Sequence, residues 1–177
     1  TTTPDVAIIG AGVVGAAIAD ALTAEGCSVA VVEGEFAGSG STGAAMGHLT
    51  VMDDSPAQLR LCHHSRRRWE ALLPELPDAV ETDRCGTLWL VADDQELAVA
   101  EAKVARYRRE GVRAELLDAR ALAEAEPSLR HGLAGALRVP DDMVCYPPAI
   151  ARALLERAVR GGARLCRPPR AIAVESG

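Results

Sequence analysis

The chain has 177 residues, of which 49% are hydrophobic and 25% charged, and its formal net charge is −6. This composition is typical of a globular protein, and the length suffices to bury a core in one ordinary domain or in part of a larger one. With an acidic balance and a single lysine, the chain lacks the basic footprint of a nucleic-acid-binding protein, so we expect no nucleic-acid partner.

Neither a signal peptide nor a membrane span is predicted. Residues 1–5 carry no basic residue, and the apolar stretch Val6–Ala19 is interrupted by glycines and too short to cross a bilayer. The five cysteines are scattered without CxxC spacing, which favours reduced thiols over a disulfide framework. We therefore expect a cytoplasmic protein and leave open a peripheral attachment to the inner face of a membrane.

The first clear pattern is a glycine-rich turn between an apolar run and a helix. The β-branched run Val6–Ile9 leads into the sequence GAGVVG at residues 10–15, and a small-residue helical pattern follows. A second apolar run, Val29–Val32, then ends at Glu33. Strand, glycine turn, helix, strand and acidic residue in this order are the fingerprint of a dinucleotide-binding βαβ unit.

Each position of this fingerprint has a physical reason. Gly10 permits the tight turn, Gly12 lets the backbone approach a pyrophosphate, and Gly15 lets the helix pack close to the strand. The helix N-terminus offers unpaired N–H groups to the phosphates, and Glu33 is placed to accept hydrogen bonds from ribose hydroxyls. The fingerprint predicts a dinucleotide but does not distinguish NAD from FAD.

The segment from Gly34 to Leu49 is glycine-dense and nearly uncharged. The hydroxyls of Ser41 and Thr42 can donate to a pyrophosphate, while the backbone of Gly43–Gly47 can lie against a flat ligand. A plain linker is the alternative, but linkers usually carry more charge or proline. The apolar far end therefore favours a ligand-binding loop.

A helix is predicted over Pro56–Leu73, with apolar residues near one face. Its basic run Arg66–Arg68 has no interleaved aromatic residues, so it predicts a solvated face rather than a nucleic-acid patch. His63 and His64 lack a second ligand pair at metal spacing, and we expect no metal site.

The remaining chain alternates less regularly. We expect further strands at Cys85–Ala92, Val112–Leu117, Gly132–Val139, Ala163–Cys166 and Arg170–Glu175, and helices at 93–111, Ala119–Ala125 and Ala149–Arg160. This order predicts an α/β fold in which a Rossmann-type unit is interrupted near residue 80 and resumes near residue 145. A continuous nicotinamide-type domain would instead alternate strands and helices regularly.

In these motifs the chain resembles the amino-acid oxidase and dehydrogenase group of flavoproteins, which includes D-amino-acid dehydrogenases, glycine and sarcosine oxidases and hydroxyproline dehydrogenases. The resemblance rests on DVAIIGAGVVGAAIADAL at residues 5–22, on VVE at 31–33 and on the segment from Ser41 to Leu49. It is supported by GTLW at 86–89, LDARALAEAEPSL at 117–129 and YPPAIARAL at 146–154. It thus extends along the whole chain in order.

The resemblance implies a Rossmann-type FAD-binding domain interrupted by part of an α+β substrate domain. Residues 1–80 and 144–177 would be two segments of the FAD-binding domain, and residues 81–143 would begin the substrate-binding domain. Members of the group run to roughly twice this length. We therefore expect a truncated, N-terminal half, with the remainder on a second chain or lost from this one.

The implied cofactor is FAD. Its pyrophosphate would contact the glycine turn with Ser41 and Thr42, its ribose would contact Glu33, and its flavin would lie along residues 45–49. The adenine would meet the backbone of Ala171. The expected cofactor-binding residues are Gly10, Gly12, Val14, Gly15, Glu33, Ser41, Thr42, Ala45, Met46, Gly47, His48, Leu49 and Ala171.

The implied chemistry is hydride transfer from the α-carbon of a small amino acid to the flavin, which gives an imine that water hydrolyses. Oxygen, a quinone or a redox protein would accept the electrons. No catalytic residue is assigned; His48 is a candidate, and a loop histidine without a catalytic role is the alternative. Two other functions stay open: an NAD-dependent dehydrogenase, and a nucleotide-binding subunit of a heteromeric complex without catalysis of its own.

Overall fold

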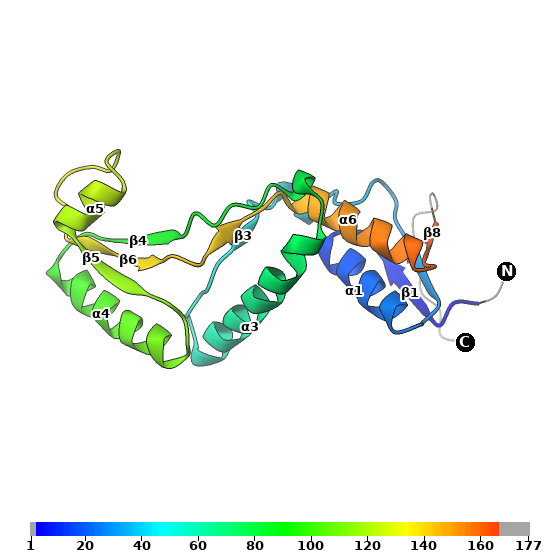
Figure 1. Ribbon diagram of the computed structural model, residues 1–177, viewed down its shortest axis with the longest axis horizontal. Coiled ribbons are helices and arrows are strands. Elements are labelled where there is room, and N and C mark those ends of the chain that lie inside the picture. The colour runs from blue at the N-terminus through cyan, green and yellow to red at the C-terminus, as the bar shows by residue number, and fades with distance from the viewer. Residues whose placement is uncertain (1–2, 167–177) are drawn as a thin grey trace. The chain divides into compact units, whose positions relative to one another are not determined.

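The computed structural model describes residues 3–166, and the chain in it forms two compact units (Figure 1). Unit 1 takes in the chain up to Gly47, the short segment Glu75–Thr82 and the chain from Cys145 onward. Unit 2 consists of His48–Pro74 and Asp83–Val144. Residues 48–74, which the sequence grouped with the first segment, therefore lie in unit 2. The assignment of the segments to FAD-binding and substrate-binding domains remains a prediction.

Unit 1 is built on a parallel sheet with the strand order β1-β2-β8. The predicted βαβ unit is confirmed: β1 (Val6–Ile9), α1 (Val13–Ala24) and β2 (Val29–Val32) follow one another, and β1 pairs with β2 in parallel. The third strand, β8 (Arg164–Cys166), pairs with the other edge of β2. The predicted strand Arg170–Glu175 lies outside the described residues.

Two helices pack together in unit 1, and both of them bury small residues. α1 buries Ala16 and Ala19, and α6 (Pro147–Arg160) buries a face that includes Ala151 and Ala158. The Arg157 guanidinium on α6 joins this layer by ion pairs to Asp20 at 3.2 Å and to Glu75 at 2.9 Å. Three short elements complete the unit: α2 (Ser41–Ala44), η2 (Asp78–Val80) and the end of η1 (Leu73–Glu75).

Unit 2 is built on an antiparallel sheet with the strand order β4-β6-β5. These strands are β4 (Thr87–Val91), β5 (Glu115–Asp118) and β6 (Gly135–Val139), and each lies within or close to a predicted strand. Two helices contact this sheet, α4 (Asp94–Arg109) and α5 (Ala119–Ala125). A separate two-stranded pair, β3 (His48–Leu49) with β7 (Met143–Val144), was not predicted.

The core of unit 2 lies between this sheet, α4 and α3 (Pro56–Leu72). Cross-strand partners share one face of an antiparallel sheet, so Val91, Leu137 and Val139 lie on the face that the core covers. The core residues are Val51, Leu59, Val91, Ala100, Val104, Tyr107, Val112, Ala114, Leu137 and Val139. Segment 50–53, which follows β3, therefore contributes to the same core as the sheet.

The basic run on α3 is not wholly solvated, and this part of the prediction was wrong. Arg67 and Arg68 are exposed, but Arg66 is only 5% exposed. Its Nη1 donates to Oδ1 of Asp142 at 3.0 Å, and Asp142 is itself fully buried. Burial raises the pKa of the Asp142 carboxyl above its ordinary value, although hydrogen bonds from Thr87, Arg66 and Val51 act in the opposite direction.

Unit 2 also contains a carboxylate that two cations hold in its charged form. The side chain of Asp53 is 7% exposed; Lys103 Nζ donates to it at 2.9 Å and Arg106 Nη2 is its second partner. Burial alone would raise the pKa of Asp53, but the hydrogen bond from Lys103 and the two positive charges outweigh it and lower the pKa. A lowered pKa means that the ionised carboxylate stabilises the folded state above the unfolded pKa.

Asp53→Asn is therefore expected to make the free energy of unfolding depend less on pH in the acid range. In the wild-type protein, the stabilisation by Asp53 is lost as the pH falls through its lowered folded pKa, below about pH 4. The variant should unfold more easily at neutral pH and should lose less further stability on acidification, as measured by urea unfolding over a pH series. Asp54→Asn is the matched control, since Asp54 is exposed and forms no ion pair within residues 3–166. An unchanged pH slope in the Asp53 variant would contradict the assignment.

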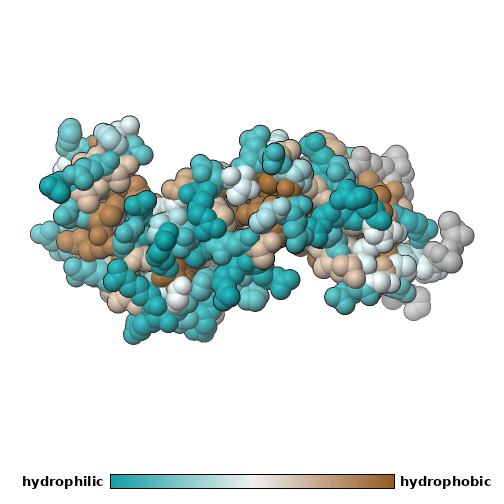
Figure 2. Space-filling view, viewed as in Figure 1, coloured by the Kyte–Doolittle hydropathy of each residue, from teal (hydrophilic) through white to brown (hydrophobic). Residues whose placement is uncertain are grey.

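Large apolar side chains are exposed in both units, and apolar patches interrupt a mostly hydrophilic surface (Figure 2). In unit 1 these include Ile9, Val14, Phe36 and Met46; in unit 2 they include Leu61, Trp89, Leu90 and Val99. Ile9 and Val14 are 61% and 69% exposed and flank the glycine turn on its two sides. Apolar surface therefore borders the turn that the sequence identified.

The sequence also led to expectations about membrane-spanning segments, metal sites and disulfide bonds. Between residues 3 and 166, no helix combines the length and the apolar composition needed to cross a membrane. The same part of the chain brings together no set of three His, Cys, Asp or Glu side chains suited to a metal ion. All five cysteines are free thiols.

Candidate nucleotide site

The glycine turn lies between β1 and α1 in unit 1. Gly10 has a φ of +97°, a conformation that favours glycine, and its N–H donates to the carbonyl of Val32 at 2.8 Å. Ala11 is completely buried, and its carbonyl accepts from the N–H of Gly38 at 2.9 Å. The turn is therefore held from one side by β2 and from the other by the loop that follows β2.

Two further glycines are required by close packing. A Cβ at Gly15 would lie 2.1 Å from the carbonyl oxygen of Gly10, and a Cβ at Gly12 would lie 2.9 Å from Oγ1 of Thr42. Both distances are shorter than side chains tolerate, and the atom opposing Gly15 belongs to the rigid backbone. Glycine at these two positions therefore lets α1 lie directly against the turn and lets Thr42 approach the start of the helix.

The N-terminus of α1 has no capping side chain of its own, because its N-cap residue is Gly12. Thr42 supplies the cap from a distant part of the sequence: its Oγ1 accepts the N–H of Val13 at 3.0 Å. The amides of Gly12, Val14 and Gly15 donate to no acceptor within the described part of the chain. Free amides at the positive end of a helix, with no acidic residue in the first turn, form a ready site for an anion.

The Glu33 carboxylate lies at the other side of the turn. Its Oε2 accepts the N–H of Ala11 at 2.7 Å, and its Oε1 accepts the N–H of Glu35 at 2.8 Å. Glu33 is 9% exposed, so these bonds compensate part of the cost of burying its charge. A carboxylate has about four acceptor positions, so one such group can accept hydrogen bonds from more than two donors. Amides on one side and a carboxylate on the other suit the phosphates and the ribose of a dinucleotide.

The family model described as "FAD dependent oxidoreductase" (DAO) matches residues 5–177. The chain belongs to this family. Its cofactor is therefore FAD, and the question that the glycine fingerprint left open between NAD and FAD is answered.

Individual relatives agree with the family. The chain is 32% identical over 169 residues to a glycine oxidase of Geobacillus kaustophilus (strain HTA426), a match that covers 91% of this chain and 45% of the relative. It is 38% identical over 93 residues to a D-amino acid dehydrogenase of Xylella fastidiosa (strain M12), covering 50% of this chain and 21% of the relative. The structure of L-proline dehydrogenase from P. horikoshii matches with a TM-score of 0.85 at 26% identity, covering 93% of this chain and 44% of that chain. The chain thus spans less than half the length of these relatives.

The residues present fit FAD. The amides of Gly12, Val14 and Gly15 have no acceptor within the described part of the chain, and Thr42 adds a hydroxyl that can still donate its hydrogen after accepting from Val13. The structure brings together Gly10, Gly12, Val14, Gly15, Glu33 and Thr42 of the predicted set by direct hydrogen bonds or by adjacency in the turn. Their roles toward FAD remain predictions.

Thr42→Val is expected to weaken FAD binding about tenfold, the effect of losing roughly one hydrogen bond with an amide left unpaired. Valine keeps the shape of the side chain but removes the acceptor of the Val13 N–H and the donor for a phosphate oxygen. Thr42→Ser keeps the hydroxyl and should bind FAD with wild-type affinity. Flavin fluorescence titration measures both variants; equal affinities for valine and serine at position 42 would refute this role of the hydroxyl.

Of the other predicted residues, Ala45 contacts this cluster, because its N–H donates to the carbonyl of Thr42 at 3.4 Å. Ser41 is exposed in the first turn of α2, and Ala45 and Met46 are exposed after it. His48 and Leu49 form β3 in unit 2, where they pair with Val144 and Met143. Ala171 lies outside the described residues.

Gly47, the last residue of this part of unit 1, is fixed by Cys145. Gly47 has a φ of +74°, and a Cβ there would lie 1.9 Å from the carbonyl oxygen of Cys145. The Cys145 N–H donates to the Gly47 carbonyl at 3.0 Å, and the thiol lies 3.3 Å from the same oxygen. Burial raises the pKa of the Cys145 thiol, so it remains protonated and able to donate. The contact with Cys145 explains why position 47 requires glycine, and the role of Gly47 beside a flat ligand remains a prediction.

Sequence reasoning missed Gly38 as part of the site. Its N–H holds the Ala11 carbonyl, its φ is +82°, and a Cβ there would lie 2.9 Å from Cα of Pro148. The glycine density of the segment after Glu33 was a signal for such a position. The partner at Pro148, at the start of α6, had no local signal because it is distant in sequence.

Proposed function

We propose that this chain binds the FAD of an enzyme that oxidises the CH–NH bond of a small amino acid: a D-amino acid, a glycine derivative, or proline or hydroxyproline. The observation that carries the proposal is the family match over residues 5–177 together with the Glu33, Thr42 and glycine-turn arrangement. The three relatives described above are named for glycine, D-amino acids and L-proline, which share an amine on the α-carbon.

Bound FAD would supply the acceptor for the hydride of the substrate α-C–H bond, which leaves an imine for water to hydrolyse. The residues of this chain bind and orient. The open amides of α1 would hold the pyrophosphate, with the hydroxyls of Thr42 and Ser41 donating to its oxygens. The Glu33 carboxylate would accept the ribose hydroxyls while it keeps the Ala11 amide in place.

Residues Ala45–Leu49 would run along the flavin, and the adenine would meet the backbone at Ala171. No base is required in this chain if the amine binds in its neutral form, because the lone pair of the nitrogen assists loss of the hydride. His48 remains the candidate for contact with the flavin or the substrate, since it is exposed and only its backbone pairs with β7. The electron acceptor would be oxygen, a quinone or a redox protein, and a second chain could complete the pocket.

The experiment that tests the proposal is anaerobic reduction of the FAD-loaded protein by a panel of amino acids. Glycine, sarcosine, D-alanine, L-proline and hydroxyproline should be compared, with the loss of visible flavin absorbance as the readout. We expect at least one of them to bleach the flavin, and deuterium on its α-carbon to slow the bleaching. Failure of every amine to reduce a bound flavin that dithionite does reduce would refute oxidation of amino acids.

A further inference from the structure

The outer face of α3 in unit 2 is basic, although the chain as a whole has a net charge of −6. Residues three or four positions apart lie on one face of a helix, and at this spacing α3 exposes a continuous set of side chains. The opposite face of α3 packs into the core of unit 2 through Leu59. We call the exposed set the basic face; it consists of Arg60, Leu61, His64, Arg67, Arg68 and Ala71.

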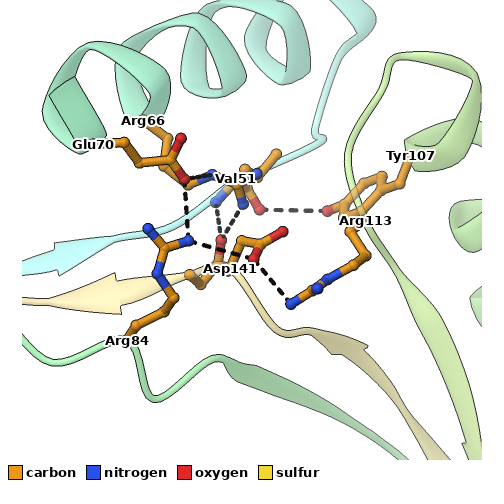
Figure 3. A network of polar contacts seen from close by, with 8 residues as sticks. Val51, Arg66, Glu70, Arg84, Tyr107, Arg113 and Asp141 are labelled. Carbon is orange, nitrogen blue, oxygen red and sulfur yellow. Dashed lines mark hydrogen bonds and ion pairs between the residues drawn. The ribbon is translucent and has the colours of Figure 1, made fainter.

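Glu70 is the only acidic residue within α3, and its charge is taken up outside the basic face. Its Oε1 lies 3.8 Å from Nε of Arg66 and 3.3 Å from Nη1 of Arg84 (Figure 3). Arg66 belongs to the buried side of α3, and Arg84 precedes β4. Glu70 therefore shares its charge with two cations that do not belong to the basic face.

The three arginines of the basic face differ in their partners. Arg60 pairs with Glu110 at 3.5 Å in an exposed contact, so part of its charge is neutralised. Arg67 and Arg68 are exposed and form no ion pair within the part of the chain that the structure describes. These two arginines therefore supply most of the net positive charge of the face.

The arginines lie close enough together to act as one group of charges. Because a helix rises about 1.5 Å per residue, Arg60 and Arg68 are separated by about 12 Å along the axis of α3. The Debye length at physiological ionic strength is about 8 Å, so a surface that touches the basic face is largely screened from acids elsewhere on the chain. An acidic chain thus presents a locally positive surface.

An exposed leucine lies among these cations. Leu61 is 68% exposed and shares the face with Arg60, His64 and Arg68. One exposed apolar side chain is common on any protein surface. Between arginines, however, it suits a layer of anionic headgroups above hydrocarbon, because the arginines can bind the headgroups while the leucine enters the boundary beneath them.

Other anionic partners fit the basic face less well. Single-stranded nucleic acid stacks its bases on aromatic side chains, and the basic face has none. An acidic protein could pair with the arginines but would need its own apolar counterpart for Leu61. A membrane surface supplies anionic and apolar groups together and requires no matching shape.

We propose that the basic face of α3 binds the surface of a membrane that contains anionic lipids. The contact is peripheral: the inner face of α3 stays in the core of unit 2, while Arg67 and Arg68 contact the anionic groups of the lipids. α3 does not cross the membrane, since no helix within residues 3–166 is long and apolar enough to do so. The proposal concerns unit 2 alone and does not depend on the proposed function.

Co-sedimentation of the FAD-loaded protein with lipid vesicles tests this proposal. We expect binding to vesicles of phosphatidylcholine mixed with phosphatidylserine, and no binding to vesicles of phosphatidylcholine alone. Binding should disappear at about 1 M salt, where the Debye length is about 3 Å. The readout is the protein recovered with the vesicles, so a failure of FAD binding or of amino-acid oxidation would leave this test intact.

Variants locate the contact on the protein. Arg67→Gln with Arg68→Gln should lower the affinity for the mixed vesicles about 25-fold, since each arginine near an anionic surface contributes about fivefold. The melting temperature should not change, because both side chains are exposed. Leu61→Ser should lower the affinity about tenfold without any change of charge. Arg120→Gln with Arg130→Gln is the matched control: it changes the net charge equally at exposed positions outside α3 and should bind like the wild type.

Absence of binding to the mixed vesicles, or an equal loss in the two double variants, would overturn the proposal. Binding of polyglutamate without binding of vesicles would identify an acidic protein as the partner and would also overturn it. Wild-type affinity of the Leu61→Ser variant would overturn the entry of the leucine and leave a contact made by charge alone.

Discussion

Gly15→Ala is expected to weaken FAD binding by about a hundredfold or more and to destabilise unit 1. The added Cβ would lie 2.1 Å from the carbonyl oxygen of Gly10 and 3.3 Å from Cγ2 of Ile8. The first of these atoms is backbone, so α1 would have to move away from the turn. That shift would displace the amides of Gly12 and Val14, which are proposed to bind the pyrophosphate. Overpacking of this kind costs about 1–3 kcal/mol, and a hundredfold loss of affinity corresponds to about 2.7 kcal/mol.

Flavin fluorescence titration and urea unfolding measure the two effects separately. Ala17→Ser is the matched control, because Ala17 is exposed on the same helix and its replacement should leave affinity and stability near the wild-type values. An alanine variant at position 15 that binds FAD like the wild type would show that the helix does not depend on this close approach.

Glu33→Ala should produce the second large loss. It removes the acceptors of the Ala11 and Glu35 amides at 2.7 and 2.8 Å, and Ala11 is fully buried, so its N–H would be left unpaired. An unpaired buried donor costs about 1–3 kcal/mol, and the loss of the proposed ribose contacts adds to this. We expect FAD affinity to fall about a hundredfold, and the glycine turn to exchange its amides faster even without FAD.

Two substitutions divide this effect into its parts. Glu33→Gln keeps one acceptor oxygen without the charge and should lose only about tenfold in affinity. Glu35→Gln should bind FAD normally, because only the main-chain N–H of Glu35 contacts Glu33. A glutamine variant as weak as the alanine variant would mean that the charge, rather than the acceptor geometry, determines binding.

The local patterns of the sequence were sufficient for the βαβ unit. Gly10, Gly12 and Gly15 have the conformation or the close contact that the fingerprint requires, and Glu33 lies at the end of β2. The helix Ala119–Ala125 was predicted with its actual ends, because Asp118 caps it and Pro127 follows it. These features depend on residues near one another in sequence.

What the sequence could not provide depends on distant partners. Thr42 was predicted to contact phosphate, but its additional role as the cap of α1 needs Val13, far away along the chain. The strands β3 and β7 have only two residues each, too short for an alternating pattern. The FAD assignment itself came from the resemblance and is supported by the family match rather than by any single contact.

The burial of Arg66 could have been predicted from its spacing along α3, but its charge led to the opposite prediction. It follows Leu59 and Cys62 at helical spacing, so it lies on the buried face of α3, yet its charge favoured a solvated position. Asp142 has no helical or strand periodicity that would mark it as the residue that receives this charge.

The most direct test of the central claim, that the α1 turn with Glu33 and Thr42 holds FAD, is a pair of titrations of the purified protein with FAD and with NADH. We expect saturable binding of one FAD per chain, weakened in the Gly15→Ala and Glu33→Ala variants, and no saturable binding of NADH. Saturable NADH binding without FAD binding, or FAD binding that neither variant affects, would contradict it.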